Sequence, residues 1–240
     1  MKIIGKIAAK AKDYTNADIP AIAFLGDSVT QGCFEVYAPA PGKVETVFEA
    51  KSGYHSCLAK ILGMLYPSAS VTIINAGISG DNACHGYERL QKDVLKFSPD
   101  LVVVSFGLND STNGREGLDK YKNALRNIFT DAKKSGCEVI FMTANMNNKY
   151  ISHKITDDFI REIANMTMEI ENSDMLKTYF EVAKEVAKEC GAKVCDVYSK
   201  WRTLAENGVD TTALLANDIN HPTREMNWLF AYSLIETMFS

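Results

Sequence analysis

The sequence lacks the features of a membrane protein and of a nucleic-acid-binding protein. No stretch approaches the ~18 to 20 consecutive apolar residues of a membrane-spanning helix. Basic residues are not in excess, since 26 Lys and Arg stand against 30 Asp and Glu, for a formal net charge of −4 at pH 7. Phosphate backbones attract clusters of positive charge, so nucleic acid is a poor candidate partner. We expect a protein that binds neither membranes nor nucleic acids.

Metal-site and secretion signals are also missing. The six cysteines include no CxxC pair, and no Cys/His cluster has the spacing of a zinc site. The N-terminus has no apolar signal-peptide core, and residues 1–12 instead have the apolar spacing of a short amphipathic helix. We therefore predict a cytoplasmic protein with free thiols, no metal and no other cofactor.

An alternation of buried strands and helices covers nearly the whole chain. The 240 residues, 46% of them hydrophobic, are enough for one sizeable core. Strands are predicted at 21–25, 71–74, 101–106, 138–142 and 193–196, and further helices at 53–65, 85–96, 118–135, 173–189 and 223–239. Continuous apolar runs are typical of parallel strands covered on both faces. We predict one α/β domain over residues 1–240, a doubly wound three-layer α/β/α sheet.

Two segments depart from this alternation. Residues 31–52, which include Pro39, Pro41 and Gly42, are expected to form a long loop after the first strand. Residues 145–157, rich in asparagine, are expected to form a second loop after the fourth strand. Ligands of open parallel sheets bind beyond the carboxyl ends of the strands, so both loops are expected near the binding site.

The first strand runs into a Gly-Asp-Ser sequence that places Ser28 at its carboxyl end. A serine hydroxyl is a weak nucleophile, and it needs a base and a group that orients the base. The segment from Asp218 to Pro222 supplies both, since one turn can bring the carboxylate to the near ring nitrogen of His221 and leave the other nitrogen for the serine. Each motif alone has an ordinary alternative, a helix cap or a polar turn.

Two more strand ends carry hydrogen-bond donors that suit a developing oxyanion. Gly80 follows the second strand and can present its backbone N–H without a side chain in the way. Asn109 follows the third strand, and its side-chain amide can point to the same place. A turn glycine and an Asx-turn remain the alternatives for these two positions.

The four blocks together resemble the SGNH hydrolase superfamily, also called GDSL esterases. The blocks are GDS at 26–28, SGD at 79–81, GxND at 107–110 and DxxHP at 218–222, so the resemblance covers nearly the whole chain. It implies a flavodoxin-like fold, a triad of Ser28, His221 and Asp218, and an acyl-enzyme mechanism. It also implies an oxyanion hole of the Ser28 and Gly80 backbone N–H groups with the Asn109 side chain. No GxSxG sequence is present, which argues against the ordinary α/β-hydrolase fold.

The leading prediction is a serine esterase for small acyl esters, with a carbohydrate O-acetylesterase as its most specific form. The polar residues 145–150 and the lack of a long apolar lid favour a small, hydrophilic ester as substrate, such as an acetylated sugar. Two alternatives stay open. A lysophospholipase or thioesterase of the same superfamily would need an apolar channel for an acyl chain. A non-catalytic carbohydrate-binding relative would be expected to have lost one of the site residues, and none is lost.

Overall fold

A parallel β-sheet forms the centre of the computed structural model, which describes residues 1–40 and 42–240. Its strands are β1 (Ala21–Gly26), β4 (Thr72–Gly77), β5 (Leu101–Ser105), β6 (Glu138–Met142) and β7 (Lys193–Cys195). They lie in the order β4-β1-β5-β6-β7, and every neighbouring pair is parallel. Counted along the chain this is the order 2-1-3-4-5 of flavodoxin-like folds. The predicted doubly wound sheet of about five parallel strands is confirmed.

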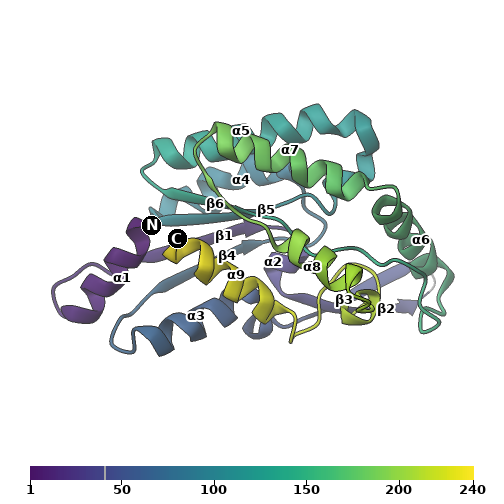
Figure 1. Cartoon of the computed structure of the whole chain (residues 1–240), viewed down its shortest axis with the longest axis horizontal. Coiled ribbons are helices and arrows are strands. Elements are labelled where there is room, and N and C mark those ends of the chain that lie inside the picture. Colours follow the sequence, from purple (N-terminus) through teal and green to yellow (C-terminus); the bar gives the residue numbers. More distant parts are fainter. Residues whose placement is uncertain (41) are drawn as a thin grey trace.

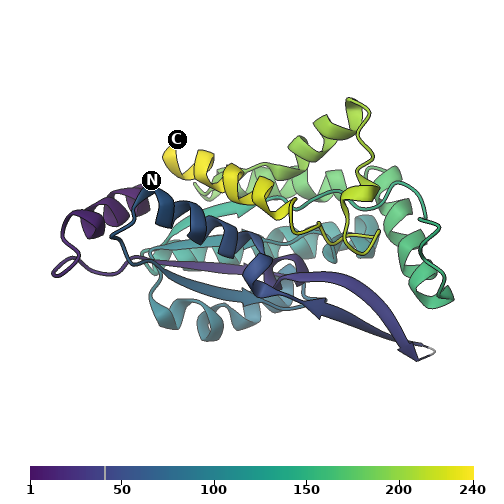
Figure 2. The same ribbon diagram turned by 90° about the horizontal axis from the view of Figure 1, so that it is seen from below.

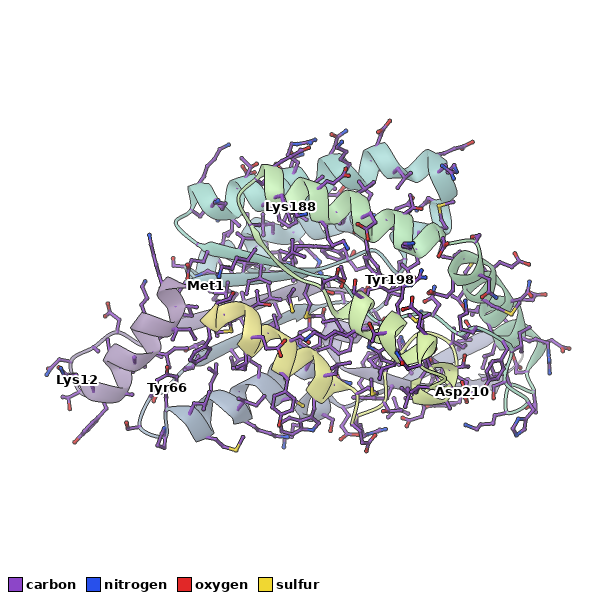
Figure 3. The ribbon with its side chains drawn as sticks, in the orientation of Figure 1. Met1, Lys12, Tyr66, Lys188, Tyr198 and Asp210 are labelled. Carbon is purple, nitrogen blue, oxygen red and sulfur yellow. The ribbon has the colours of Figure 1, made fainter. Side chains whose placement is uncertain are left out.

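Helices cover both faces of the sheet, as its apolar strands require. Every residue of β5 is buried, which is typical of a parallel strand between two helical layers. One layer consists of α3 (Tyr54–Leu65) and α9 (Asn227–Phe239), and the other of α4 (Ala83–Asp93), α5 (Leu118–Lys134) and α7 (Met175–Glu189) (Figure 1). Side chains fill the space between the sheet and both layers (Figure 3).

The two ends of the chain lie side by side. Helix α1 (Lys2–Lys12) buries Ile3 and Ile7, as its amphipathic spacing predicts. The amino group of Met1 donates to the backbone carbonyl of Met238 at 3.1 Å. Figures 1 and 2 show the N- and C-termini together at the edge of the helical layer that contains α9. No helix of the described residues is long and apolar enough to cross a membrane.

The prediction of a long loop over residues 31–52 is wrong. After the short helix α2 (Ser28–Gln31), strands β2 (Cys33–Ala40) and β3 (Lys43–Phe48) form an antiparallel hairpin that projects beyond the sheet (Figure 2). Both strands are rich in β-branched and aromatic residues around a Pro-Gly pair, which is a hairpin signal. The prolines of the segment masked that signal, and one of them, Pro41, lies outside the described residues.

Besides the short α2, two longer helices of the described residues were not predicted. They are α6 (Asp158–Asn172) and α8 (Val197–Glu206), and the segment 145–157 before α6 has neither helix nor strand, as expected. The buried face of α6 includes Thr167 and Glu171, so polar residues interrupt the apolar periodicity that would reveal the helix. The remaining short turns are 3₁₀ helices at Ala50–Ser52, Leu95–Phe97, Asp110–Gly117 and Thr212–Leu214.

Candidate active site

Ser28 is the first residue of α2 and lies at the carboxyl end of β1. The carboxylate of Asp27 caps this short helix by accepting the Val29 backbone N–H at 3.0 Å. The turn is tight, because a Cβ atom at Gly26 would lie 2.7 Å from the Ser105 carbonyl oxygen and would also collide with Thr30. The glycine of the Gly-Asp-Ser sequence is therefore required for the close packing that fixes the serine.

Ser28 and His221 lie within hydrogen-bond distance of each other, although 193 positions separate them in the sequence. His221 Nε2 is 3.0 Å from Ser28 Oγ, and both residues are buried. His221 Nδ1 lies 2.8 Å from the backbone carbonyl oxygen of Phe34. A carbonyl oxygen only accepts, so Nδ1 carries the proton and Nε2 is free to accept the Ser28 O–H. The pair is thus arranged for proton transfer from serine to histidine.

The turn that carries His221 is held by a side chain that the sequence analysis did not single out. Asn217 Oδ1 accepts the backbone N–H groups of Ile219, Asn220 and His221 at 3.0, 2.9 and 2.9 Å. This arrangement is an Asx-type turn, for which an asparagine shortly before the motif is the usual signal. Asn217 therefore fixes the backbone from which the imidazole projects.

The structure does not bring Asp218 to the imidazole. Its carboxylate Oδ1 is 3.2 Å from the Lys154 ammonium, and the residue has a left-handed backbone with φ of 55°. The position beside His221 Nδ1 is taken by the carbonyl of Phe34 on strand β2. Neither Phe34 nor Lys154 was singled out from the sequence, since both lie in segments expected to be loops.

Each of the three predicted oxyanion donors keeps a hydrogen that is available to a ligand. The Ser28 and Gly80 backbone N–H groups have no acceptor among residues 1–40 and 42–240. The residue before Gly80, Ser79, donates its N–H to the Gln31 side chain, and the residue after it, Asp81, accepts an Asn109 Nδ2 hydrogen at 2.8 Å. The chain around Gly80 is thus tied to both α2 and Asn109. One Nδ2 hydrogen of the asparagine amide is left for a ligand.

A largely buried arginine supports the loops around the site. Arg89 on α4 forms an ion pair with Asp81 through Nε and Nη2, at 2.7 and 2.6 Å. The same guanidinium donates to the backbone carbonyls of Gly26 and Ala76 at the ends of two neighbouring strands. It therefore connects the serine turn to the loop that contains the Gly80 donor.

Loss of this arginine is expected to destabilise the fold. The side chains of Arg89 and Asp81 are only 12% and 4% exposed, so Arg89→Met leaves a buried carboxylate with only the exposed His85 imidazole, 3.6 Å away, as a partner. We expect the free energy of unfolding to fall by about 3 kcal/mol in urea denaturation. The matched control is Arg126→Met, which removes an exposed pair with Glu189 and is expected to cost less than about 1 kcal/mol. Equal effects of the two variants would contradict the role of Arg89.

Two acidic side chains beside the site are held in unusual electrostatic surroundings. Burial raises the pKa of Asp27 to about 7, and the neighbouring carboxylates of Asp110 and Asp81 add to the shift. Burial likewise raises the pKa of Asp110 to about 6, and its Oδ1 accepts the Ala83 N–H at 3.0 Å. Both carboxyl groups accept backbone N–H groups of the catalytic loops, which is a supporting role.

The asparagine side chains of the segment 145–157 point into the protein. The Asn145 amide donates to the carbonyls of Met146 and Asn220, and the Asn148 amide donates to those of Tyr150 and Ala164. Both asparagines are fully buried. These amides therefore hold the loop in place. The two asparagines do not support the expectation that the polar residues 145–150 face a hydrophilic substrate.

A cavity of about 580 Å³ is lined by residues that neighbour Phe34 and His221 in the sequence. Its wall on strand β2 begins at Glu35, directly after Phe34, and its opposite wall includes Lys154 and Asp218. The full lining is Glu35, Val36, Tyr37, Ala38, Lys154, Ile155, Thr156, Asp157, Ile160, Ala216, Asn217 and Asp218. A lining that combines apolar side chains such as Ile155 and Ile160 with charged ones such as Lys154 and Asp157 suits a ligand that has both C–H faces and hydroxyl groups.

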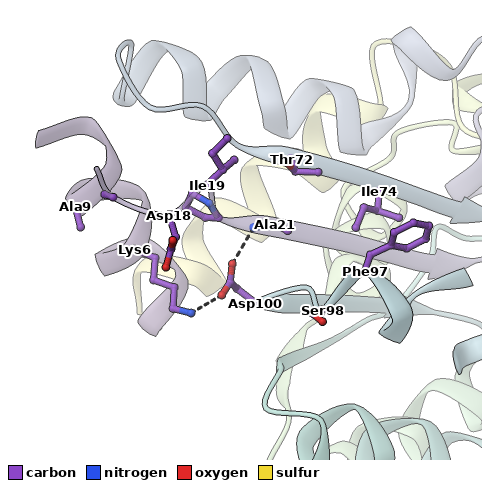
Figure 4. Close-up of a pocket in the computed structure, with 12 residues that line it drawn as sticks. Lys6, Ala9, Asp18, Ile19, Ala21, Thr72, Ile74, Phe97, Ser98 and Asp100 are labelled. Carbon is purple, nitrogen blue, oxygen red and sulfur yellow. Dashed lines mark hydrogen bonds and ion pairs between the residues drawn. The ribbon is translucent and has the colours of Figure 1, made fainter. Parts of the chain in front are cut away.

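A larger cavity of about 740 Å³ lies at the opposite edge of the sheet. Figure 4 shows its lining, in which Lys6 pairs with Asp100 and Asp100 accepts the Ala21 backbone N–H at 2.8 Å. Ala21 is the first residue of β1, so this cavity lies at the amino ends of the strands, far from Ser28. Asp100 thus satisfies the first backbone N–H of β1. No residue of the four sequence blocks lines this cavity. Across the described residues, no group of three or more potential metal ligands gathers at any point.

Known proteins share the fold and part of the sequence. The crystal structure of an acetylxylan esterase from Geobacillus stearothermophilus matches with a TM-score of 0.67 at 23% identity, over 91% of this chain and 94% of that one. In sequence, an acetylxylan esterase from the same organism is 25% identical over 211 residues, which are 84% of this chain and 86% of the relative. An arylesterase from Vibrio mimicus is 30% identical over 125 residues, 49% of this chain and 62% of the relative.

Fold, site and relatives together define a carboxylic ester hydrolase. The model of the GDSL-like lipase/acylhydrolase family matches residues 24–229, and the chain belongs to this family. The resemblance seen in the four sequence blocks is thereby confirmed at the level of the family.

Proposed function

We propose that the chain is a serine esterase that removes small acyl groups, acetyl groups above all, from a carbohydrate or a similar polar alcohol. The observation that supports it most is the buried Ser28–His221 pair, with Nε2 3.0 Å from Oγ and with the histidine tautomer that can take the serine proton. The pair lies at the carboxyl end of β1, where substrates of open parallel sheets bind.

In the proposed reaction Ser28 is the nucleophile and His221 the general base. Ser28 Oγ attacks the ester carbonyl carbon while its proton passes to His221 Nε2. The tetrahedral intermediate collapses, the bond to the alcohol oxygen breaks, and His221 returns the proton to the leaving alcohol. Water then attacks the acyl-enzyme by the same route, and the acid is released with Ser28 restored.

The three donors described above supply the oxyanion site of the proposal. The free N–H groups of Ser28 and Gly80 and the free amide hydrogen of Asn109 would stabilise the charge that develops on the carbonyl oxygen. Gly80 has a left-handed backbone with φ of 77°, which suits glycine. Asp218 is proposed as the third member of the triad, which stabilises the imidazolium during turnover.

The cavity described above supports a polar alcohol as leaving group. Its rim carries Glu35, Lys154, Asp157 and Asp218, which suit hydroxyl groups better than an acyl chain. The acetylxylan esterase relative, aligned over 84% of this chain, supports an acetylated sugar as substrate. The test is kcat/KM across acetylated xylooligosaccharides and aryl esters of increasing acyl length. The proposal predicts the highest values for acetyl esters, and a value that climbs with acyl length would refute it.

The acid limit of activity follows from the state of His221. Burial lowers the pKa of His221 to about 4, and the Phe34 carbonyl that accepts from Nδ1 opposes part of this shift. The general base must be neutral, so protonation below this pKa removes activity while higher pH preserves it. We expect kcat/KM to stay level down to about pH 5 and to fall tenfold per unit below about pH 4. A fall centred near the ordinary histidine pKa, with the fold intact by circular dichroism, would contradict this.

A further inference from the structure

The carboxylate of Asp218 has two potential cationic partners, Lys154 on the segment 145–157 and His221 in its own turn. In the structure it binds the Lys154 ammonium at 3.2 Å. The imidazole of His221, three residues further along, becomes a cation each time it accepts the serine proton. The backbone of this turn is fixed, because the Ala216 N–H donates to the His221 carbonyl at 2.7 Å and Leu215 pairs with Pro222. A change of partner therefore requires rotation of the Asp218 side chain and transfer of the Nδ1–H hydrogen bond from the Phe34 carbonyl to the carboxylate.

The ion pair between Lys154 and Asp218 is weak. The Lys154 side chain is 64% exposed, and exposed ion pairs contribute little because water and salt screen them. Asp218 itself has a left-handed backbone, which is disfavoured for a residue other than glycine. Strained residues of this kind gather at functional sites.

In the resting arrangement Ser28 and His221 can exchange a proton, but the imidazolium that forms is only weakly stabilised. The neutral carbonyl of Phe34 fixes the tautomer of His221, yet it stabilises an imidazolium less than a carboxylate does, because a charge-assisted hydrogen bond is stronger. Arrival of the Asp218 carboxylate would therefore accelerate the reaction beyond the rate of the resting arrangement.

A substrate bound in the cavity described above can change which partner Asp218 binds. Lys154 and Asp218 both line it, and Thr156 adds a hydroxyl group to the lining. Its volume of about 580 Å³ is ample for a sugar residue attached to the ester. A sugar hydroxyl in this cavity can accept a hydrogen bond from the Lys154 ammonium in place of the carboxylate.

We propose that Lys154 determines specificity for the alcohol part of the ester, on the basis of the proposed esterase function. Hydroxyl groups of a polyhydroxylated leaving group bind the Lys154 ammonium, and the Asp218 carboxylate then turns to His221. A leaving group without hydroxyls leaves Asp218 on Lys154, and the reaction proceeds with the Phe34 carbonyl alone. Lys154 is a positioning residue, since it acts on the chemistry through Asp218.

The test compares Lys154→Met with wild type on phenyl acetate and on an acetylated xylooligosaccharide. For phenyl acetate we expect kcat to rise by about threefold to tenfold, because nothing competes with His221 for the carboxylate. For the oligosaccharide ester we expect KM to rise by about tenfold with kcat unchanged, because a charged hydrogen bond to the sugar is lost. Adding Asp218→Asn to Lys154→Met is expected to abolish the gain on phenyl acetate.

The matched control is Lys149→Met, on the same loop and outside the cavity. Its kinetics on both substrates are expected to equal those of wild type. The inference is overturned if Lys154→Met changes both substrates by the same factor, or if kcat for phenyl acetate does not rise. Activity that persists in Ser28→Ala would instead overturn the proposed function, so the two failures are distinguishable.

Discussion

Ser28→Ala is expected to lower kcat for ester hydrolysis by at least about 10⁴-fold, because the variant has no atom that can form the acyl-enzyme. The Oγ atom lies 3.0 Å from His221 Nε2 in a buried pair, and no other hydroxyl is recorded at that nitrogen among the described residues. The loss is measured in kcat for phenyl acetate, with the melting temperature as a check that the fold persists.

The matched control for this variant is Ser56→Ala. The Ser56 hydroxyl donates to the Ala50 carbonyl at 2.8 Å, on the exposed side of α3, so its removal is expected to leave kcat unchanged. A Ser28→Ala enzyme that keeps more than about a hundredth of the wild-type kcat would contradict the assignment of the nucleophile.

Asn109→Ala is expected to lower kcat by about 10²-fold to 10³-fold with little change in KM. The amide donates one hydrogen to the Asp81 carbonyl at 2.8 Å, which holds the other hydrogen in a fixed direction. A donor aimed at the oxyanion acts mainly in the transition state, so the loss appears in kcat. The measurement is steady-state kinetics on acetyl esters.

The control for the asparagine is Asn165→Ala, which removes an exposed hydrogen bond to Glu169 on α6. This variant is expected to retain wild-type kinetics. A loss at Asn109 of less than tenfold, or one expressed as a rise in KM alone, would remove this amide from the proposed oxyanion site.

The sheet and the meeting of Ser28 with His221 were predictable because their signals are local. Apolar runs such as residues 101–105 are buried on both faces, and few structures other than a parallel strand accommodate them. The Gly-Asp-Ser sequence places Ser28 at a strand end. The segment with His221 was expected at a strand end too, although in the structure it follows the 3₁₀ helix Thr212–Leu214. Since both segments were expected at one edge of the sheet, their meeting could be inferred without knowledge of the packing.

The surroundings of the histidine could not be predicted, because they depend on groups that carry no sequence signal. Phe34 contributes a backbone carbonyl, which every residue has, from a hairpin whose prolines indicated a loop. Lys154 is one exposed lysine among many, and only the fold brings it to Asp218. The spacing of the motif fixed the turn that carries Asp218 and left the direction of its side chain open.

The Asn-rich segment was misinterpreted for a different reason. Its polar composition was taken to indicate side chains that face the substrate. Amide side chains satisfy buried backbone carbonyls as readily as they bind sugars, and Asn145 and Asn148 do the former. The polar contacts of the neighbouring cavity come instead from charged residues such as Lys154 and Asp157. The kind of substrate therefore depends on the cavity and not on the asparagine content of the loop.

Covalent labelling with a fluorophosphonate probe tests the nucleophile most directly, because the probe reacts only with a serine that its surroundings activate. Intact-mass measurement and peptide mapping report both the number of adducts and the residue that carries them. The account predicts one adduct on Ser28 in the wild type and none in Ser28→Ala. Labelling that persists in Ser28→Ala, or that is absent from a folded wild type, would contradict it.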